Sequence, residues 1–233
     1  MPRPRQPLIS RAGAVAAATE IIDTEGLDAL SLPRLARHLD VRAPSLYHHF
    51  DDKSEILGAV VAAIVAETVV PRKPPPERWV DWFVQLSLNL RRAVLRHRNA
   101  APLLLQFPPR DLLADLYEDA ARFLETSGVP TEVHVQILDS MDTLVLGAVI
   151  SEAARSPAAR RAIFPNVDAE RQPVLARALD SNRFTANRLF EEMIRSFLHG
   201  VVALADQGRD ASAGTPSATG AAADAASGAS APS

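Results

Sequence analysis

Clustered prolines divide this 233-residue chain into short segments, and that division constrains the fold more than any other feature. Proline removes a backbone donor and restricts the residue before it, so helices end near these positions. The breaks fall at Pro71, Pro74–Pro76, Pro102, Pro108–Pro109 and Pro130. Between them apolar residues recur with the period of a helix, and no window alternates apolar and polar residues as a strand does. The sequence therefore predicts an all-α protein.

Composition excludes several classes of protein. Hydrophobic residues make up 47% and charged residues 23%, a balance typical of a soluble globular chain. The formal charge of −3 means that any nucleic-acid surface must be local. The absence of cysteine excludes disulfides, Cys-ligated metal sites and thiol catalysis. The uncharged stretch Ile56–Ala66 is too short to span a bilayer, and the first residues lack the apolar core of a signal peptide, so we expect a cytoplasmic protein.

The segment from Ser31 to Phe50 has the pattern of a helix-turn-helix. Ser31 is a good N-cap, Pro33 lies in the first turn where a missing N–H costs little, and Asp40–Val41 forms the turn. A very short second helix is predicted over Ser45–Phe50. In such motifs the N-terminal residues of the second helix enter the major groove of DNA. The apolar interior of the predicted motif consists of Leu35, Ala36, Leu39, Val41, Leu46 and Phe50.

Polar residues around this second helix suit contacts with DNA. The guanidinium of Arg42 offers two parallel donors for a guanine edge or a phosphate. Ser45, Tyr47 and His49 offer donors for phosphate oxygens, and Lys53 adds charge where the next helix begins. The predicted DNA-contacting set is Ser31, Arg34, Arg42, Ala43, Pro44, Ser45, Tyr47, His48, His49 and Lys53.

Two later segments have apolar belts wider than one core-facing stripe requires. They are Val133–Ala154 and Leu189–Ala205, which contain Gly147 and Gly200 respectively. A helix that is apolar around most of its circumference buries two sides. Both helices are compatible with a central core position. We favour a four-helix interface between two copies of the chain, in which glycine permits close approach.

The two ends of the chain have a different character. Arg3 and Arg5 lie in a proline-rich extended arm that is expected to be disordered and idle, and a transient contact with the minor groove or a phosphate is the alternative. Residues 207–233 consist mostly of Ala, Ser, Gly, Thr and Pro without apolar periodicity. We expect this segment to be a disordered tail.

No motif indicates an enzyme. A helical bundle that holds catalytic metal ions carries Glu-x-x-His pairs on facing helices, and the Glu132-x-His134 spacing does not match. Nucleotide-binding glycine loops, the G-x-S-x-G elbow and the H-E-x-x-H zinc motif are absent from the sequence. We therefore expect no metal and no cofactor.

The motifs of the first 57 residues together resemble the TetR family of transcriptional regulators. The resemblance begins at Ala14–Gly26 and continues through Leu30–Ala36 and Leu39–Val41. Its most specific part is the run Pro44–Phe50, followed by an acidic pair, Lys53 and Leu57. Looser similarity to the ligand domain of tetracycline-repressor-type members extends to about residue 206, through Trp79, Arg96–Arg98, Leu146–Gly147 and Phe190–Gly200.

The resemblance implies a domain organisation and a function. Residues 1–52 would form a three-helix DNA-binding domain, and 53–206 a connector helix with a ligand-binding and dimerisation domain, in about nine helices overall. Such a protein binds a palindromic operator as a homodimer, most often as a repressor, and a small molecule releases it. Pro33 stands where tetracycline-responsive relatives carry a base-reading arginine, so Arg34 and Arg42 are the expected readers. A helical protein that sequesters a small molecule without binding DNA is the alternative.

The expected ligand site is largely apolar. Val69 and Leu104 stand where the tetracycline-binding members carry histidines, and Ser151 where an acid lies near magnesium, so we expect another effector. Trp82, Leu86 and Leu90 share one face of a predicted helix. Every candidate is also compatible with a place in the core. The full candidate set is Trp82, Leu86, Leu90, Leu104, Phe107, Tyr117, His134 and Met141.

Overall fold

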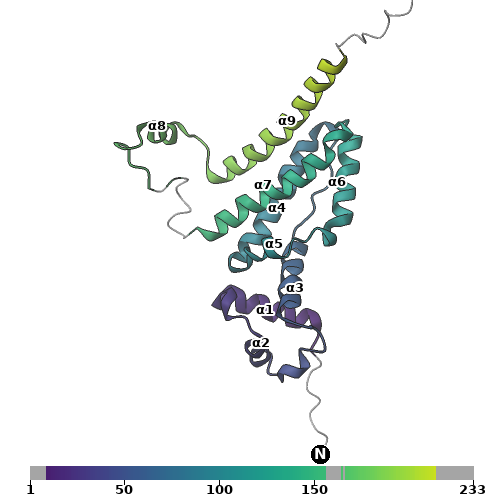
Figure 1. Ribbon diagram of the computed structural model, residues 1–233, viewed down its shortest axis with the longest axis vertical. Helices are drawn as coiled ribbons and strands as arrows, with labels where there is room; N and C mark the ends of the chain where they lie inside the picture. The colour runs from purple at the N-terminus through teal and green to yellow at the C-terminus, as the bar shows by residue number, and fades with distance from the viewer. Residues whose placement is uncertain (1–8, 156–163, 165, 214–233) are drawn as a thin grey trace, which may run out of the picture.

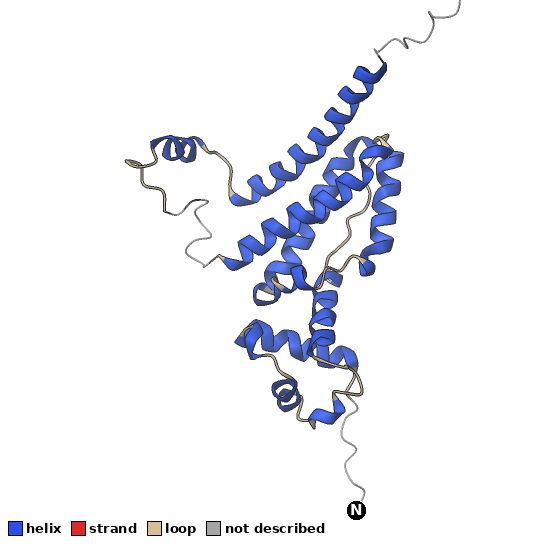
Figure 2. Cartoon of the chain, viewed as in Figure 1, coloured by secondary structure: helices blue, strands red, loops and turns tan. Residues whose placement is uncertain are grey.

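The computed structural model describes residues 9–155, 164 and 166–213, and over these residues the chain contains α-helices and no strand (Figures 1 and 2). The prediction of an all-α protein of about nine helices is confirmed. The arm with Arg3 and Arg5 lies outside the described residues. The helices are α1 Arg11–Glu25, α2 Leu32–His38, α3 Lys53–Ala66, α4 Trp79–Arg96, α5 Leu103–Gln106, α6 Ala114–Thr126, α7 His134–Ala154, α8 Pro173–Ser181 and α9 Ala186–Ala213.

A small head of α1, α2 and the start of α3 lies at one end of the molecule (Figure 1). Helix α1 begins where the Ser10 side chain accepts a hydrogen bond from the Gly13 amide at 3.0 Å. It ends at Gly26, whose φ of 95° is strained for other residues. The buried face of α1 packs against side chains from the rest of the head, which include Leu35, Leu46 and Phe50. Helix α3 leaves the head and continues into the larger body.

The turn of the helix-turn-helix is fixed by backbone hydrogen bonds. Asp40 adopts a left-handed conformation with φ 52°, which Asp tolerates better than most residues. The Val41 amide then donates to the Ala36 carbonyl at 3.0 Å, as in a Schellman motif. The predicted helix over Ser45–Phe50 is wrong in detail, because the structure has a 3₁₀ turn at Ala43–Ser45 followed by turns. A segment as short as Ser45–Phe50 forms too few i→i−4 backbone hydrogen bonds to sustain a regular α-helix.

The body is built around α4, which packs against α7 and α9. Trp82 is buried, lies edge-on to Phe83 and Phe123, and donates from Nε1 to the Pro71 carbonyl at 2.9 Å. This bond anchors the proline-rich connector between α3 and α4. On another face of α4, Arg91 forms a two-pronged ion pair with Glu152 of α7, at 2.7 and 2.8 Å.

One described stretch, Thr131–Ala154, is long and apolar enough to cross a membrane by length and composition alone. Core helices of soluble proteins pass the same test. This stretch includes α7, which packs against α4, α6 and α9. The sequence-based expectation that no segment spans a membrane considered only stretches without charged residues. Thr131–Ala154 was not among them, because Asp139 and Asp142 interrupt its apolar run.

The C-terminal part differs from the sequence expectation at two places. Helix α9 continues to Ala213, so residues 207–213, which the sequence assigns to the tail, are helical. Alanine and arginine there have high helix propensity, which outweighs one glycine. The rest of the expected tail, 214–233, lies outside the described residues. Helix α8 was not predicted at all; it starts at Pro173, projects away from the body in Figure 1 and has no buried residue.

Candidate DNA-binding surface and effector cavity

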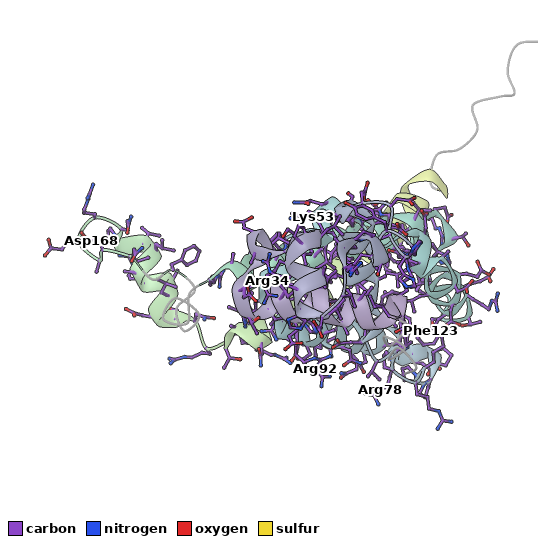
Figure 3. The ribbon with its side chains drawn as sticks, turned by 90° about the horizontal axis from the view of Figure 1, so that it is seen from below. Arg34, Lys53, Arg78, Arg92, Phe123 and Asp168 are labelled. Carbon is purple, nitrogen blue, oxygen red and sulfur yellow. The ribbon has the colours of Figure 1, made fainter. Side chains whose placement is uncertain are left out.

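Most of the predicted DNA-contacting residues lie at the outer surface of the head. Arg42, Pro44, His48, Lys53 and Ser31 are exposed, and the Tyr47 ring is 56% exposed. Figure 3 looks up at this head, over which both Arg34 and Lys53 lie. The remaining predicted contacts are half-buried: Arg34, Ala43, Ser45 and His49.

The basic residues of the head fall into two groups. Arg34 is held by Glu25 through two hydrogen bonds, one of them at 3.1 Å from Nε, and this bonding lowers the pKa of the Glu25 carboxyl. Among the described residues, no acidic side chain pairs with Arg37, Arg42 or Lys53. These three cations are therefore available to phosphates without breaking an ion pair. Sequence reasoning missed Arg37, although its place on α2 was a visible signal.

A clamp fixes the end of the DNA-contacting segment to the body of the head. The Arg11 guanidinium lies 4.4 Å from the centre of the Phe50 ring, donates to the His49 carbonyl and pairs with Glu55 at 2.8 Å. Glu55 also accepts from the Asp51 amide at 2.7 Å, and these bonds lower its pKa. The clamp holds the turn after Tyr47 and His48 against α1 and α3.

The body encloses a largely apolar cavity of about 560 Å³ between α3, α4, α6 and α7. That volume suits a drug-sized molecule. Its polar side chains are few, and one of them, the buried Thr68 hydroxyl, has no hydrogen-bond partner among the described residues. The cavity is lined by residues of all four helices and of the 3₁₀ turn before α6, including Val65, Phe83, Leu86, Ser87, Leu90, Leu112, Leu113, Leu116, Ala120, Leu138, Met141 and Val145.

A polar pair stands at the α6–α7 side of this cavity. The Tyr117 hydroxyl donates to Asp142 Oδ2 at 2.5 Å, and the Arg110 Nε atom lies 3.7 Å from the same oxygen. Arg110 also pairs with Asp139 at 2.7 Å. Burial raises the pKa of the Asp142 carboxyl. Burial and the bond to Asp142 raise the pKa of the Tyr117 phenol. No cluster of potential metal ligands occurs among the described residues.

The structure divides the predicted ligand residues. Leu86, Leu90, Tyr117 and Met141 line the cavity. Leu104 lines a second cavity beside it, and Phe107 lines a surface groove near α3. Trp82 and His134 line neither cavity.

Trp82 and His134, which line neither cavity, are both buried. Trp82 bonds the connector, and the His134 ring bonds the Val129 carbonyl at 3.0 Å. Sequence reasoning missed the leucines before and within α6, whose apolar stripe was the available signal.

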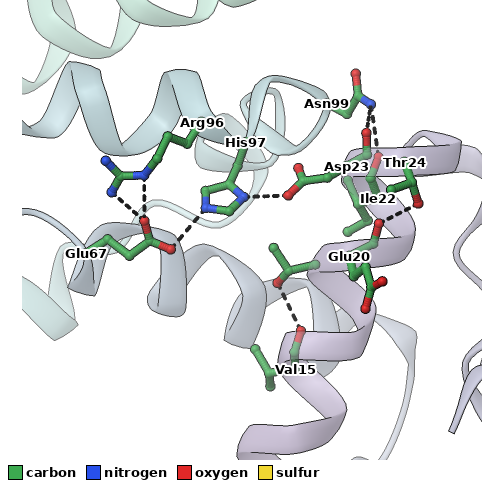
Figure 4. A network of polar contacts seen from close by, with 10 residues as sticks. Val15, Glu20, Ile22, Asp23, Thr24, Glu67, Arg96, His97 and Asn99 are labelled. Atoms are coloured by element: carbon green, nitrogen blue, oxygen red, sulfur yellow. Dashed lines mark hydrogen bonds and ion pairs between the residues drawn. The ribbon is translucent and has the colours of Figure 1, made fainter.

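A polar junction joins the head to the body (Figure 4). It is adjacent to the cavity, because Ala66 and Thr68 on either side of Glu67 line the cavity. At its centre, His97 Nδ1 lies 2.6 Å from Asp23 of α1, and Nε2 lies 3.0 Å from Glu67 at the end of α3. Arg96 also donates to Glu67, which lowers the pKa of that carboxyl. The Asn99 amide donates to the Ile22 carbonyl at 3.0 Å. We call these groups the junction.

Comparison with known proteins identifies both parts of the chain. A family model described as bacterial regulatory proteins of the tetR family matches residues 14–60. A second, described as the tetracyclin repressor-like C-terminal domain, matches residues 71–205. Tetracycline repressor protein class E of Escherichia coli is 29% identical over 195 residues, which are 83% of this chain and 90% of that protein.

Solved structures agree with the family models. Apo ActR from Streptomyces coelicolor superposes with a TM-score of 0.71 at 25% identity, over 88% of this chain and 100% of that one. ActR in complex with actinorhodin superposes with a TM-score of 0.69 at 25% identity, over 84% and 97% of the two chains. Since the second family model alone spans more than half of the sequence, the protein belongs to the TetR family of bacterial regulators, whose members bind DNA and small-molecule effectors and are not enzymes.

Proposed function

We propose that this protein is a cytoplasmic transcriptional repressor that binds a palindromic operator as a homodimer and leaves it when a largely apolar effector fills the cavity. The observation that carries the proposal is the position of α3. Its first residue, Lys53, belongs to the predicted DNA-contacting set, and its last turn lines the cavity through Ala62, Val65 and Ala66. One helix therefore connects the two sites.

The end of α3 also gives a route for coupling. Ala66 and Thr68 line the cavity, and Glu67 between them bonds to His97 in the junction. An effector that displaces this turn also displaces the carboxylate that holds α3 to α4. Two half-sites lie about 34 Å apart or a small multiple of that, so a small change in head spacing loses many contacts. The effector must bind the released state more tightly than the DNA-bound state.

An exposed leucine on α9 and two glycines, one on α7 and one on α9, support the homodimer. Leu204 of α9 is 68% exposed. Nothing lies within 4 Å of where a Cβ would stand on Gly147 or Gly200, so another helix can approach both. We expect Leu204→Glu to shift the protein towards monomer in light scattering, whereas Val69→Glu, at an exposed position in the connector between α3 and α4, leaves the mass unchanged. A mass unaffected by Leu204→Glu would place the interface elsewhere.

Titration onto DNA tests the repressor proposal. The protein is added to the DNA upstream of its own coding sequence and to a shuffled control, at two salt concentrations. We expect selective binding, and a loss of about 1–3 kcal/mol for Arg42→Ala that relaxes specificity at one base pair. Equal binding to both DNAs would contradict autoregulation. Equal weakening on all sequences would assign Arg42 to a phosphate.

A further inference from the structure

The polar pair Tyr117–Asp142 stands between two cavities rather than at the end of one. The second cavity, of about 320 Å³, is lined by Leu104, Pro108 and Leu146 among others. Tyr117 and Asp142 line both cavities, together with Val65, Leu90 and Leu113. A molecule long enough to occupy both cavities must therefore pass the pair in its middle.

The Tyr117–Asp142 pair can accept further hydrogen bonds but has no free donor. Its single donor, the Tyr117 hydroxyl, is already used on Asp142 Oδ2. The other carboxylate oxygen and the phenol oxygen still have lone pairs. Arg110, the nearest cation, divides its contacts between Asp142 and Asp139. The three charged groups leave a local charge of one negative unit, which disfavours an anionic guest.

We propose that the effector is an elongated, largely apolar molecule with a hydroxyl or amino group in its middle, which donates a hydrogen bond to Asp142, and that it carries no negative charge there. This inference rests on the proposed function, since it specifies the effector of that cavity. A half-buried carboxylate discriminates between guests, because a guest without a donor covers its free lone pairs and gives them no hydrogen bond. The raised pKa of Asp142 agrees with its partial desolvation.

Displacement of N-phenyl-1-naphthylamine, whose fluorescence rises in apolar cavities, tests the proposal on the intact protein. Three ring-matched competitors differ in one group: 2-naphthol donates a hydrogen bond, 2-methoxynaphthalene only accepts, and 2-naphthoate is an anion. We expect 2-naphthol to bind the wild type roughly tenfold more tightly than either of the others, the size of one hydrogen bond to a charged group.

Three variants assign that preference to Asp142. In Asp142→Asn the side-chain amide can donate a hydrogen bond to the guest, so 2-naphthol should bind about as tightly as 2-methoxynaphthalene. Tyr117→Phe should keep it, because the carboxylate remains. Asp139→Asn is the matched control: it removes the same charge from the same helix, but Asp139 lines neither cavity. The control should keep the wild-type preference for 2-naphthol over 2-methoxynaphthalene.

The outcomes separate the two proposals. If the fluorescent probe does not bind the wild type, the apolar cavity takes no guest, and the proposed function falls together with this inference. If the probe binds and the wild type shows no preference for 2-naphthol, only the inference is overturned. The inference is also overturned if Asp142→Asn and Asp139→Asn change the preference equally.

Discussion

The junction and the cavity are neighbours on α3, yet opposite kinds of interaction build them. The junction holds α1, α3 and α4 together through a histidine, an arginine and two carboxylates. The cavity has apolar walls with one polar pair. Hydrogen bonds depend steeply on distance and angle, whereas apolar contacts are non-directional. The junction can therefore sense a small displacement, and the cavity can accept guests of varied shape.

The pKa values of one carboxyl in each region shift in opposite directions. In the junction, hydrogen bonds from Arg96 and His97 lower the pKa of Glu67. In the cavity, burial raises the pKa of Asp142. A lowered carboxyl pKa means that the charged form stabilises the fold, and a raised one means that it destabilises the fold. The junction therefore supports the folded head–body arrangement, while the cavity keeps a partly desolvated carboxylate whose free lone pairs a guest can satisfy.

The largest expected effect comes from breaking the junction with His97→Ala. This change leaves the Asp23 and Glu67 carboxylates facing each other without the ring between them. The His97 side chain is only 15% exposed, so the loss resembles removal of a partner from buried polar groups. We expect the free energy of unfolding to fall by about 1–3 kcal/mol in urea titration, with weaker operator binding.

Arg96→Ala is the control for that variant. It removes the other partner of Glu67, but the Arg96 side chain is 55% exposed. Exposed ion pairs contribute about 0–1 kcal/mol, so this variant should stay near the wild type. If both variants lose the same stability, His97 has no special place in the junction.

A smaller effect is expected from filling the cavity with Ala120→Leu. Ala120 is buried on α6 and lines the cavity, so the added methyl groups occupy space that a guest needs. Probe binding should weaken roughly tenfold, since overpacking costs about 1–3 kcal/mol. Operator binding without effector should not change. The control, Ala114→Leu, adds the same side chain at an exposed position of α6, and weaker probe binding there would contradict the assigned site.

How far the sequence predicts each region depends on how local its signals are. The helix-turn-helix was predictable because a cap, a turn and a short apolar interior all lie within Ser31–Phe50. Its second helix was not predicted correctly, since the choice between an α-helix and a 3₁₀ turn depends on a few hydrogen bonds. That Glu25 holds Arg34 could not be foreseen, because the two residues belong to different helices.

The cavity and the junction were less predictable, because both depend on long-range packing. An apolar stripe marks Leu86 and Leu90 as inward-facing, but it does not distinguish a cavity wall from the core, where Trp82 lies. The tyrosine–aspartate pair joins residues 25 positions apart, and His97 meets Asp23 across 74 positions. No periodicity encodes such contacts. The sequence could supply the residue types and not their partners.

The smallest expected effect is the different way in which Glu67 and Asp142 change the free energy of unfolding with pH. At neutral pH, Glu67→Gln should lower the free energy of unfolding by less than about 1 kcal/mol, because the pair is exposed. Asp142→Asn should raise it, because Asn keeps an acceptor for Tyr117 and removes a destabilising charge. Near the ordinary carboxyl pKa values, about 4, the effect of Asp142→Asn should vanish, because Asp142 is then protonated in both states. The effect of Glu67→Gln should shrink below that pH and vanish only when the pH falls through the lowered pKa of folded Glu67.

Urea titrations at pH 7 and pH 4 measure both variants. Since the lowered pKa of Glu67 makes stability rise with pH and the raised pKa of Asp142 makes it fall, the two differences must have opposite signs at pH 7. Equal signs would mean that the cavity carboxylate is satisfied without a guest. Asp142 would then have no unsatisfied lone pair with which to select a hydrogen-bond donor.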